Sequence, residues 1–167
     1  MRSLKISFVA LILIFGSAYT QAQPVLPASN AIDKITNAYI GVKNALVESD
    51  GGQAQLRAKL LLKELSANPE QRLKPEQKVQ WAAFADKLKF DTRHISETTV
   101  VAHQREHFGT LSKNMFAVLK KLKLNTLTVY EQYCPMKKQM WISETAAIRN
   151  PYYGKQMLEC GTTRETL

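Results

Sequence analysis

Apolar residues recur every three or four positions through residues 32–122, and this spacing restricts the possible folds more than any other feature of the chain. An α-helix turns once every 3.6 residues, so the pattern places one apolar stripe along each helix. It predicts helices over four segments, which are residues 29–49, 53–65, 75–90 and 92–123. Four amphipathic helices with short connections predict a mainly α protein built as an up-down four-helix bundle.

The ends of these segments carry helix start and stop signals. Ser29 or Asn30 is the expected N-cap of the first helix, and the sequence DGG at 50–52 is expected to break it. Pro75 suits the first turn of the third helix, because a proline lacks the N–H that a first turn leaves unbonded. Asp91 is the expected N-cap of the fourth helix.

The last part of the chain has a different composition. The segment TLTVYEQYC (126–134) is rich in β-branched and aromatic residues, which predicts a strand, and KKQMWIS (137–143) is its expected partner across a tight turn. NPYYG (150–154) is a typical turn sequence, and KQMLECG (155–161) is predicted to form a short helical turn. Together these segments predict a small C-terminal cap of a β-hairpin and turns, residues 124–167, on the bundle.

The first 22 residues have the layout of a cleavable signal peptide. A basic start, MRSLK, precedes a predominantly apolar run of ten residues, ISFVALILIF, and then small residues, with cleavage expected after Ala22. An apolar run of this length is too short to span a bilayer, which takes about 20 residues. The later apolar segments are short and contain lysine, so no transmembrane segment is expected in the mature chain. The sequence therefore predicts a periplasmic or secreted protein with a single domain over residues 23–167.

Neither the charge pattern nor the motifs of the mature chain indicate nucleic-acid binding or catalysis. Loss of Arg2 and Lys5 with the signal peptide leaves 21 basic and 14 acidic side chains, a net charge of +7. The lysines are scattered, and no aromatic residues alternate with them as in a base-stacking surface, so no nucleic-acid partner is expected. No serine stands in a nucleophile-elbow pattern, and the chain is interpreted as non-enzymatic.

The chain has two cysteines, Cys134 and Cys160, and both lie in the cap. In an exported protein an even number of cysteines is typical of disulfides. A Cys134–Cys160 bridge would close a loop of 26 residues and stabilise the fold by about 3.5 kcal/mol in the chain-entropy model. A disulfide is therefore one interpretation of the pair.

A metal site is the other interpretation. Met136 follows Cys134 by two residues, and Met157 precedes Cys160 by three, so up to four sulfur ligands are available. Thiolate and thioether sulfur favour Cu(I). His107 stands four residues after His103 in HQREH, on the same side of a helix, and is a candidate auxiliary ligand. His94 is expected to have a structural role.

Several segments resemble a known family when they are taken in order. YIGVKNALVESDG, HQREHFGTLSKNM, VYEQYCPM and IRNPYYGKQMLECG are similar to a domain-of-unknown-function family of exported Gram-negative proteins. The same domain forms the tail of copper/silver-efflux membrane-fusion adaptors. The resemblance covers residues 32–167, and it places family motifs on Cys-Pro-Met at 134–136, NPYYG at 150–154, MLECG at 157–161 and QREHF at 104–108. It implies a role in heavy-metal handling.

One departure from the family pattern concerns the hairpin. Lys137 directly follows Cys-Pro-Met, and Trp141 comes early, so a short connection between the two strands is expected. The motif at 104–108 includes His107 and leaves His103 outside it.

Two functional hypotheses follow. The first is a periplasmic protein that binds copper as Cu(I), for sequestration or for delivery to a heavy-metal efflux system as partner. Its predicted ligands are Cys134, Met136, Met157 and Cys160, with His107 as auxiliary ligand. The alternative is an envelope protein-interaction module without metal, stapled by a Cys134–Cys160 disulfide and docking through Tyr152 and Tyr153. Both hypotheses require positions 134 and 160 to lie together.

Overall fold

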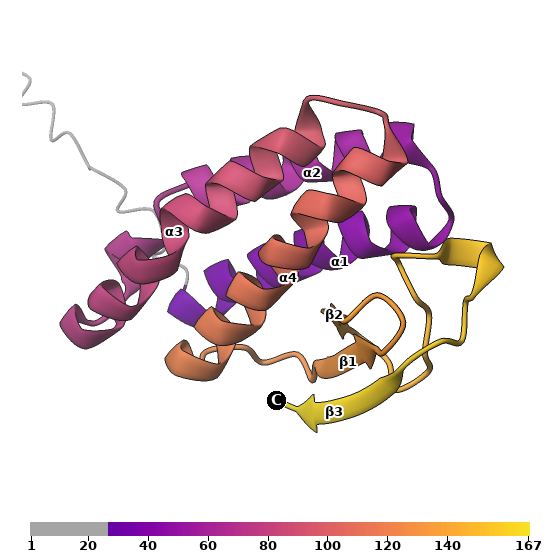
Figure 1. The fold of residues 1–167 in the computed structure, drawn as a ribbon. Coiled ribbons are helices and arrows are strands. Elements are labelled where there is room, and N and C mark those ends of the chain that lie inside the picture. Colours follow the sequence, from indigo (N-terminus) through magenta and orange to yellow (C-terminus); the bar gives the residue numbers. More distant parts are fainter. Residues whose placement is uncertain (1–26) are drawn as a thin grey trace, which may run out of the picture.

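The computed structural model describes residues 27–167, and the predicted signal peptide lies outside this range (Figure 1). The described chain is mainly α, with four helices followed by a three-stranded sheet, which confirms the predicted fold class. The helices are α1 (Ala28–Val47), α2 (Gly51–Ser66), α3 (Pro75–Ser96) and α4 (Val101–Leu122). The strands are β1 (Tyr130–Cys134), β2 (Gln139–Ser143) and β3 (Thr162–Thr166), and two short 3-10 helices are η1 (Pro69–Arg72) and η2 (Gly154–Gln156).

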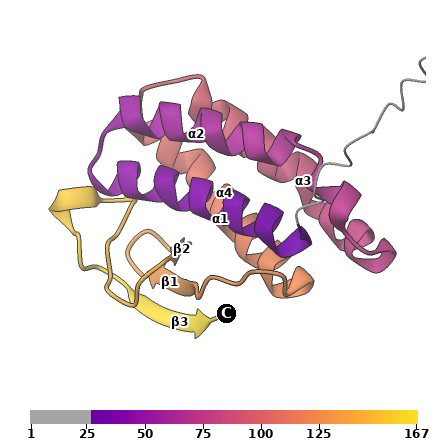
Figure 2. The ribbon, with the colours of Figure 1, turned by 180° about the vertical axis from the view of Figure 1, so that it is seen from behind.

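The helices run up and down and pack in sequence order, α1 on α2, α2 on α3 and α3 on α4. The sheet lies against α4 and α1, on the side of the bundle away from α2 (Figures 1 and 2). Among the described residues, no helix has the length and apolar character needed to cross a bilayer.

The prediction of one helix over residues 92–123 with Asp91 as its N-cap is wrong. α3 continues through Asp91 to Ser96, the chain turns at residues 97–100, and α4 begins at Val101. The turn falls in a run of β-branched residues, where the Thr98 hydroxyl accepts the Val100 N–H at 3.1 Å. This local hydrogen bond competes with the helix, so the chain reverses and α4 folds back onto α3.

Gln104 holds this reversal in place from the first turn of α4. Its side-chain amide donates to the carbonyls of Thr98 at 2.7 Å and Gly51 at 2.9 Å. Gly51 approaches so closely that a Cβ there would lie 1.9 Å from the Thr99 carbonyl oxygen. The α3–α4 turn is thus fastened to the start of α2.

Two predicted helix starts also need correction. α1 begins at Ala28 after Pro27, and neither Ser29 nor Asn30 is its N-cap. The segment DGG is the start of α2 and not only a break, because Asp50 is the N-cap and its carboxylate accepts the Gln53 N–H at 2.8 Å. The predicted place of Pro75, in the first turn of α3, is confirmed.

The predicted hairpin is confirmed, and a third strand is added to it. β1 and β2 pair antiparallel, with Tyr130 opposite Ser143 and Cys134 opposite Gln139, so the connection spans only residues 135–138. β3 pairs antiparallel with the other edge of β1, giving the order β2-β1-β3. The sequence did not predict β3, because its side chains are mostly exposed and lack an apolar alternation.

The turn predicted at NPYYG is present, and Gly154 has the positive φ, +56°, that favours glycine. The segment predicted as a helical turn, KQMLECG, is helical only in η2, which ends at Gln156. From Met157 the backbone leaves the helical region and leads into β3.

The cap shares its core with the bundle. Trp141 and Ile142 of β2 are fully buried in the same apolar cluster as Tyr39 of α1 and Phe108 of α4. The Tyr39 and Phe108 rings stack with centroids 5.3 Å apart. The sheet is therefore held to the helices by apolar burial, which fixes the position of its cysteines relative to the bundle.

Candidate metal centre

The tail brings the two cysteines together, as predicted. Cys134 is the last residue of β1, Cys160 lies two residues before the start of β3, and these strands are neighbours in the sheet. Both residues are free thiols, with their Sγ atoms 3.5 Å apart. Cys134 is fully buried and Cys160 is half-buried, so the pair is reached from the Cys160 side.

Asn150 fixes the loop that leads to Cys160. Its side-chain oxygen accepts the backbone N–H of Tyr152 at 2.8 Å, and its amide donates to the Cys160 carbonyl at 2.7 Å. Asn150 is fully buried, so these bonds are shielded from water. Asn150 therefore connects the NPYYG turn directly to the second cysteine.

Arg105 ties the same turn to the bundle. It lies on α4 within HQREH, and its guanidinium donates to the carbonyls of Pro151 at 2.7 Å and Leu46 at 3.0 Å. Burial lowers the pKa of Arg105 from its ordinary value, but such a strong base remains charged. The cap is thus joined to α1 and α4 near the end at which α4 begins.

The two thiols have different acidities. Burial acts to raise the pKa of the Cys134 thiol, but hydrogen bonds to its sulfur outweigh this effect and lower the pKa. The Lys137 backbone N–H, 3.4 Å from the Cys134 sulfur, donates one of them. The pKa of Cys160 is raised, first by its hydrogen bond with Cys134 and then by burial. The pair therefore favours a Cys134 thiolate that accepts a hydrogen bond from the Cys160 thiol, and the thiolate is the form that binds metals.

The two methionines next to the thiols are exposed. Met136 lies in the connection between β1 and β2 with 65% of its surface exposed, and Met157 follows η2 with 37% exposed. Met157 belongs to a turn in which its carbonyl accepts the Cys160 N–H at 3.1 Å. Both thioethers are therefore on the surface, each close in sequence to one of the cysteines, and neither fills space in the core.

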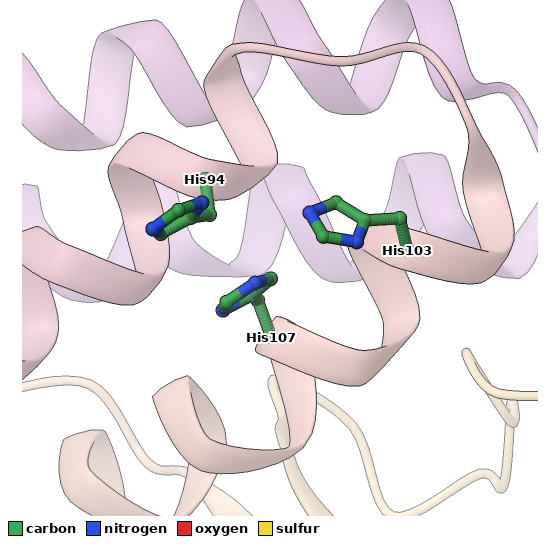
Figure 3. Close-up of side chains that lie close together, drawn as sticks. All are labelled: His94, His103 and His107. Carbon is green, nitrogen blue, oxygen red and sulfur yellow. The ribbon is translucent and has the colours of Figure 1, made fainter.

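His107 lies with the other histidines and not with the cysteines. His94 comes from α3, and His103 and His107 come from α4, and Figure 3 shows the three rings facing a common space between these helices. One ligand nitrogen from each ring can be chosen such that all three lie within 4.8 Å of one another. His107 was predicted to assist the sulfur ligands, but the structure places it with His94 and His103 instead. His94, which was predicted to be structural, belongs to this histidine group.

The environment of His107 is specific. Its Nδ1 lies 3.1 Å from a carboxylate oxygen of Asp91, which is almost fully buried on α3. The rings of His94 and His107 are stacked, 4.4 Å apart and within 5° of parallel. Burial raises the pKa of Asp91, and the hydrogen bond with His107 partly opposes this effect. The sequence could not reveal the group, because a continuous helix would place His94 and His107 about 20 Å apart along its axis.

The two tyrosines predicted to form an interface, Tyr152 and Tyr153, differ in burial. Tyr152 is only 4% exposed, packs edge-on to Trp141 and donates its hydroxyl to the Met140 carbonyl, so it belongs to the core of the cap. Tyr153 is half-buried, so part of its side chain remains accessible to a partner.

Comparison with known proteins places the chain by family but not by activity. A family model described as "Protein of unknown function (DUF3347)" matches residues 35–126, more than half of the chain. The match includes Asp91 and all three histidines and ends at residue 126, before β1 begins. No curated protein and no solved structure matches the chain.

Proposed function

The chain belongs to the DUF3347 family of proteins of unknown function, and we propose that it is an exported, non-enzymatic protein that binds copper as Cu(I) at Cys134 and Cys160. The observation that carries the proposal is the 3.5 Å separation of two free sulfur atoms. With metal–sulfur bonds of about 2.3 Å, as for zinc, sulfurs at this distance subtend about 100° at one ion, near the tetrahedral angle. The pair can therefore share an ion with little movement.

The chemistry of the neighbouring side chains favours Cu(I) over harder cations. The lowered pKa of Cys134 favours its thiolate form, and thioether sulfur is a ligand that soft ions accept. Met136 and Met157 are exposed and close to the cysteines in the sequence, so a turn of either side chain toward the ion would leave no gap in the core. The two thioethers would complete a set of four sulfur ligands for Cu(I).

The exposure of the methionines also suggests what the site is for. A ligand that is 65% exposed, such as Met136, can be exchanged for a ligand of another protein. We assign the site to sequestration of Cu(I) or its delivery to a heavy-metal efflux system in the periplasm. Export is supported by the signal-peptide pattern of residues 1–22.

Titration of the reduced, metal-free mature protein with Cu(I) against a competing chelator tests the proposal. We expect one equivalent to bind, and the Cys134→Ser/Cys160→Ser variant to lose it. Met136→Leu and Met157→Leu should each weaken binding, whereas Met115→Leu, a buried core substitution of similar volume, should not. Full stoichiometry in the double serine variant would refute the ligand assignment.

The same proximity supports a second candidate, the disulfide-stapled interaction module without metal. Oxidation would bring the two sulfurs from 3.5 Å to about 2.05 Å. Thiol quantification on protein taken from the periplasm separates the candidates. Two free thiols support the copper site, and a full disulfide together with no Cu(I) binding after reduction supports the module.

A further inference from the structure

The three histidines of the chain all lie in one place, although they are spread over two helices. His94 and His107 are half-buried and His103 is exposed, with 45% of its side chain accessible. Core packing does not require an exposed imidazole at this point, and the group that the three rings form contains no cysteine. We propose that His94, His103 and His107 form a second metal site, separate from the cysteines, for a divalent transition cation of the Zn²⁺ or Cu²⁺ class.

Asp91 supplies the supporting contact that such a site needs. Metal-binding histidines commonly donate their second ring N–H to a carboxylate, which fixes the tautomer and the orientation of the ring. The Asp91 carboxylate, 3.1 Å from Nδ1 of His107, does this and leaves the Nε2 lone pair of His107 for a cation. Asp91 acts through His107 and is therefore a positioning residue.

The geometry indicates an open site that contracts when it is filled. Bonds of about 2.0–2.1 Å to a tetrahedral ion place imidazole nitrogens about 3.4 Å apart. The nitrogens now lie within 4.8 Å of one another, so each pair must approach by at most about 1.4 Å. One ring of the His94–His107 stack must also turn, because a bound ion lies in the plane of each ring.

The ligand type and number determine the class of cation. Neutral imidazole suits zinc and copper, while Mg²⁺ and Ca²⁺ prefer oxygen ligands. Three protein ligands leave a fourth position for water or for an incoming group. Exposed His103 is on the open side, and this position can therefore exchange with solvent.

Co²⁺ is a suitable probe for the full mature chain under reducing conditions. Nitrogen ligation gives visible d–d bands without the near-ultraviolet charge-transfer bands of thiolate ligation. We expect one equivalent with nitrogen-type spectra, displaced by Zn²⁺. His103→Gln should weaken Co²⁺ binding at least tenfold, and Thr110→Ala, an exposed control on the same helix, should leave binding unchanged.

Asp91→Asn tests the positioning role. It should keep the stoichiometry but weaken Co²⁺ binding by about 10- to 100-fold, because the amide is a poorer partner for the His107 N–H. If His107→Gln or His94→Gln fails to fold, the exposed His103 variant still decides the question. Unchanged Co²⁺ binding in His103→Gln, or loss of all Co²⁺ binding in Cys160→Ser, would overturn the proposal. Failure of Cu(I) binding alone would leave it standing, since the two titrations report different residues.

Discussion

Replacing Tyr39 with phenylalanine removes a single oxygen atom from the contact between the helices and the cap. Tyr39 lies on α1, and its side chain is fully buried. The hydroxyl accepts the Ile142 backbone N–H at 3.1 Å and lies 2.6 Å from the Ser112 hydroxyl. It therefore connects α1 with β2 and with α4 at one point.

The Tyr39→Phe variant keeps the ring, so its cost comes from the groups that lose a partner. The Ser112 hydroxyl can turn to the carbonyl four residues earlier in its helix, whereas the Ile142 N–H is fixed by the strand. A buried donor without a partner costs about 1–3 kcal/mol, and loss of the bond to Ser112 costs about 1 kcal/mol. We expect the free energy of unfolding to fall by about 2–4 kcal/mol.

Equilibrium urea unfolding followed by circular dichroism measures this change. The midpoint should fall while the slope m stays constant, because the surface exposed on unfolding is unchanged. Tyr130→Phe, at a half-buried tyrosine of β1, is the matched control and should change stability by less than about 0.5 kcal/mol. A loss below about 1 kcal/mol for Tyr39→Phe would show that the Ile142 N–H does not depend on this hydroxyl.

Three further substitutions test other parts of the structure. Glu144→Gln leaves the ammonium of buried Lys43, 2.7 Å from the carboxylate, without its ion pair and should cost about 2–3 kcal/mol, less than a fully buried pair because Glu144 is 39% exposed. Burial opposes ionisation of Glu144, but hydrogen bonds, first that from Lys43, hold its pKa below the ordinary 4.5. The stabilisation from the ion pair is therefore complete above pH 4.5, and it is lost as the pH falls through the lower pKa of Glu144 in the folded state. Acid unfolding curves of Glu144→Gln should therefore be flatter in that window, and a parallel shift would contradict the assignment. Gly51→Ala places a Cβ 1.9 Å from the Thr99 carbonyl oxygen and should lower both the melting temperature and the Co²⁺ affinity, because the α3–α4 turn must move. Asn150→Ala leaves buried backbone groups without partners, and a Cu(I) affinity within twofold of the wild type would show that the turn does not position the second cysteine.

The two candidate metal sites differ in how far the sequence could predict them. The cysteines are close because β1 and β3 are neighbours, and a chain reversal between them was predictable from the turn residues of NPYYG. The predicted ligand type, sulfur, followed from composition alone. The exact separation of the sulfurs depends on the pairing of a strand that carries no apolar alternation, so the sequence could not supply it.

The histidine group depends on a smaller local event, the turn at residues 97–100. Apolar periodicity continues through this segment, and the competing hydrogen bond from Val100 to Thr98 has no periodic signature. Once the turn forms, α4 folds back along α3 and His94 meets His107. A run of β-branched residues around Thr98 was the available signal for this break.

The sequence by itself determined the number of helices, the mainly α class and the β-hairpin, because these follow from periodicity and turn chemistry within short segments. The tertiary structure alone decided that His94 and Asp91 of α3 meet His107 of α4, and it set the distance between the sulfurs of Cys134 and Cys160. Local patterns specify which face of an element is buried. The partner on the opposite element is specified only when all the apolar faces are buried together in one close-packed core.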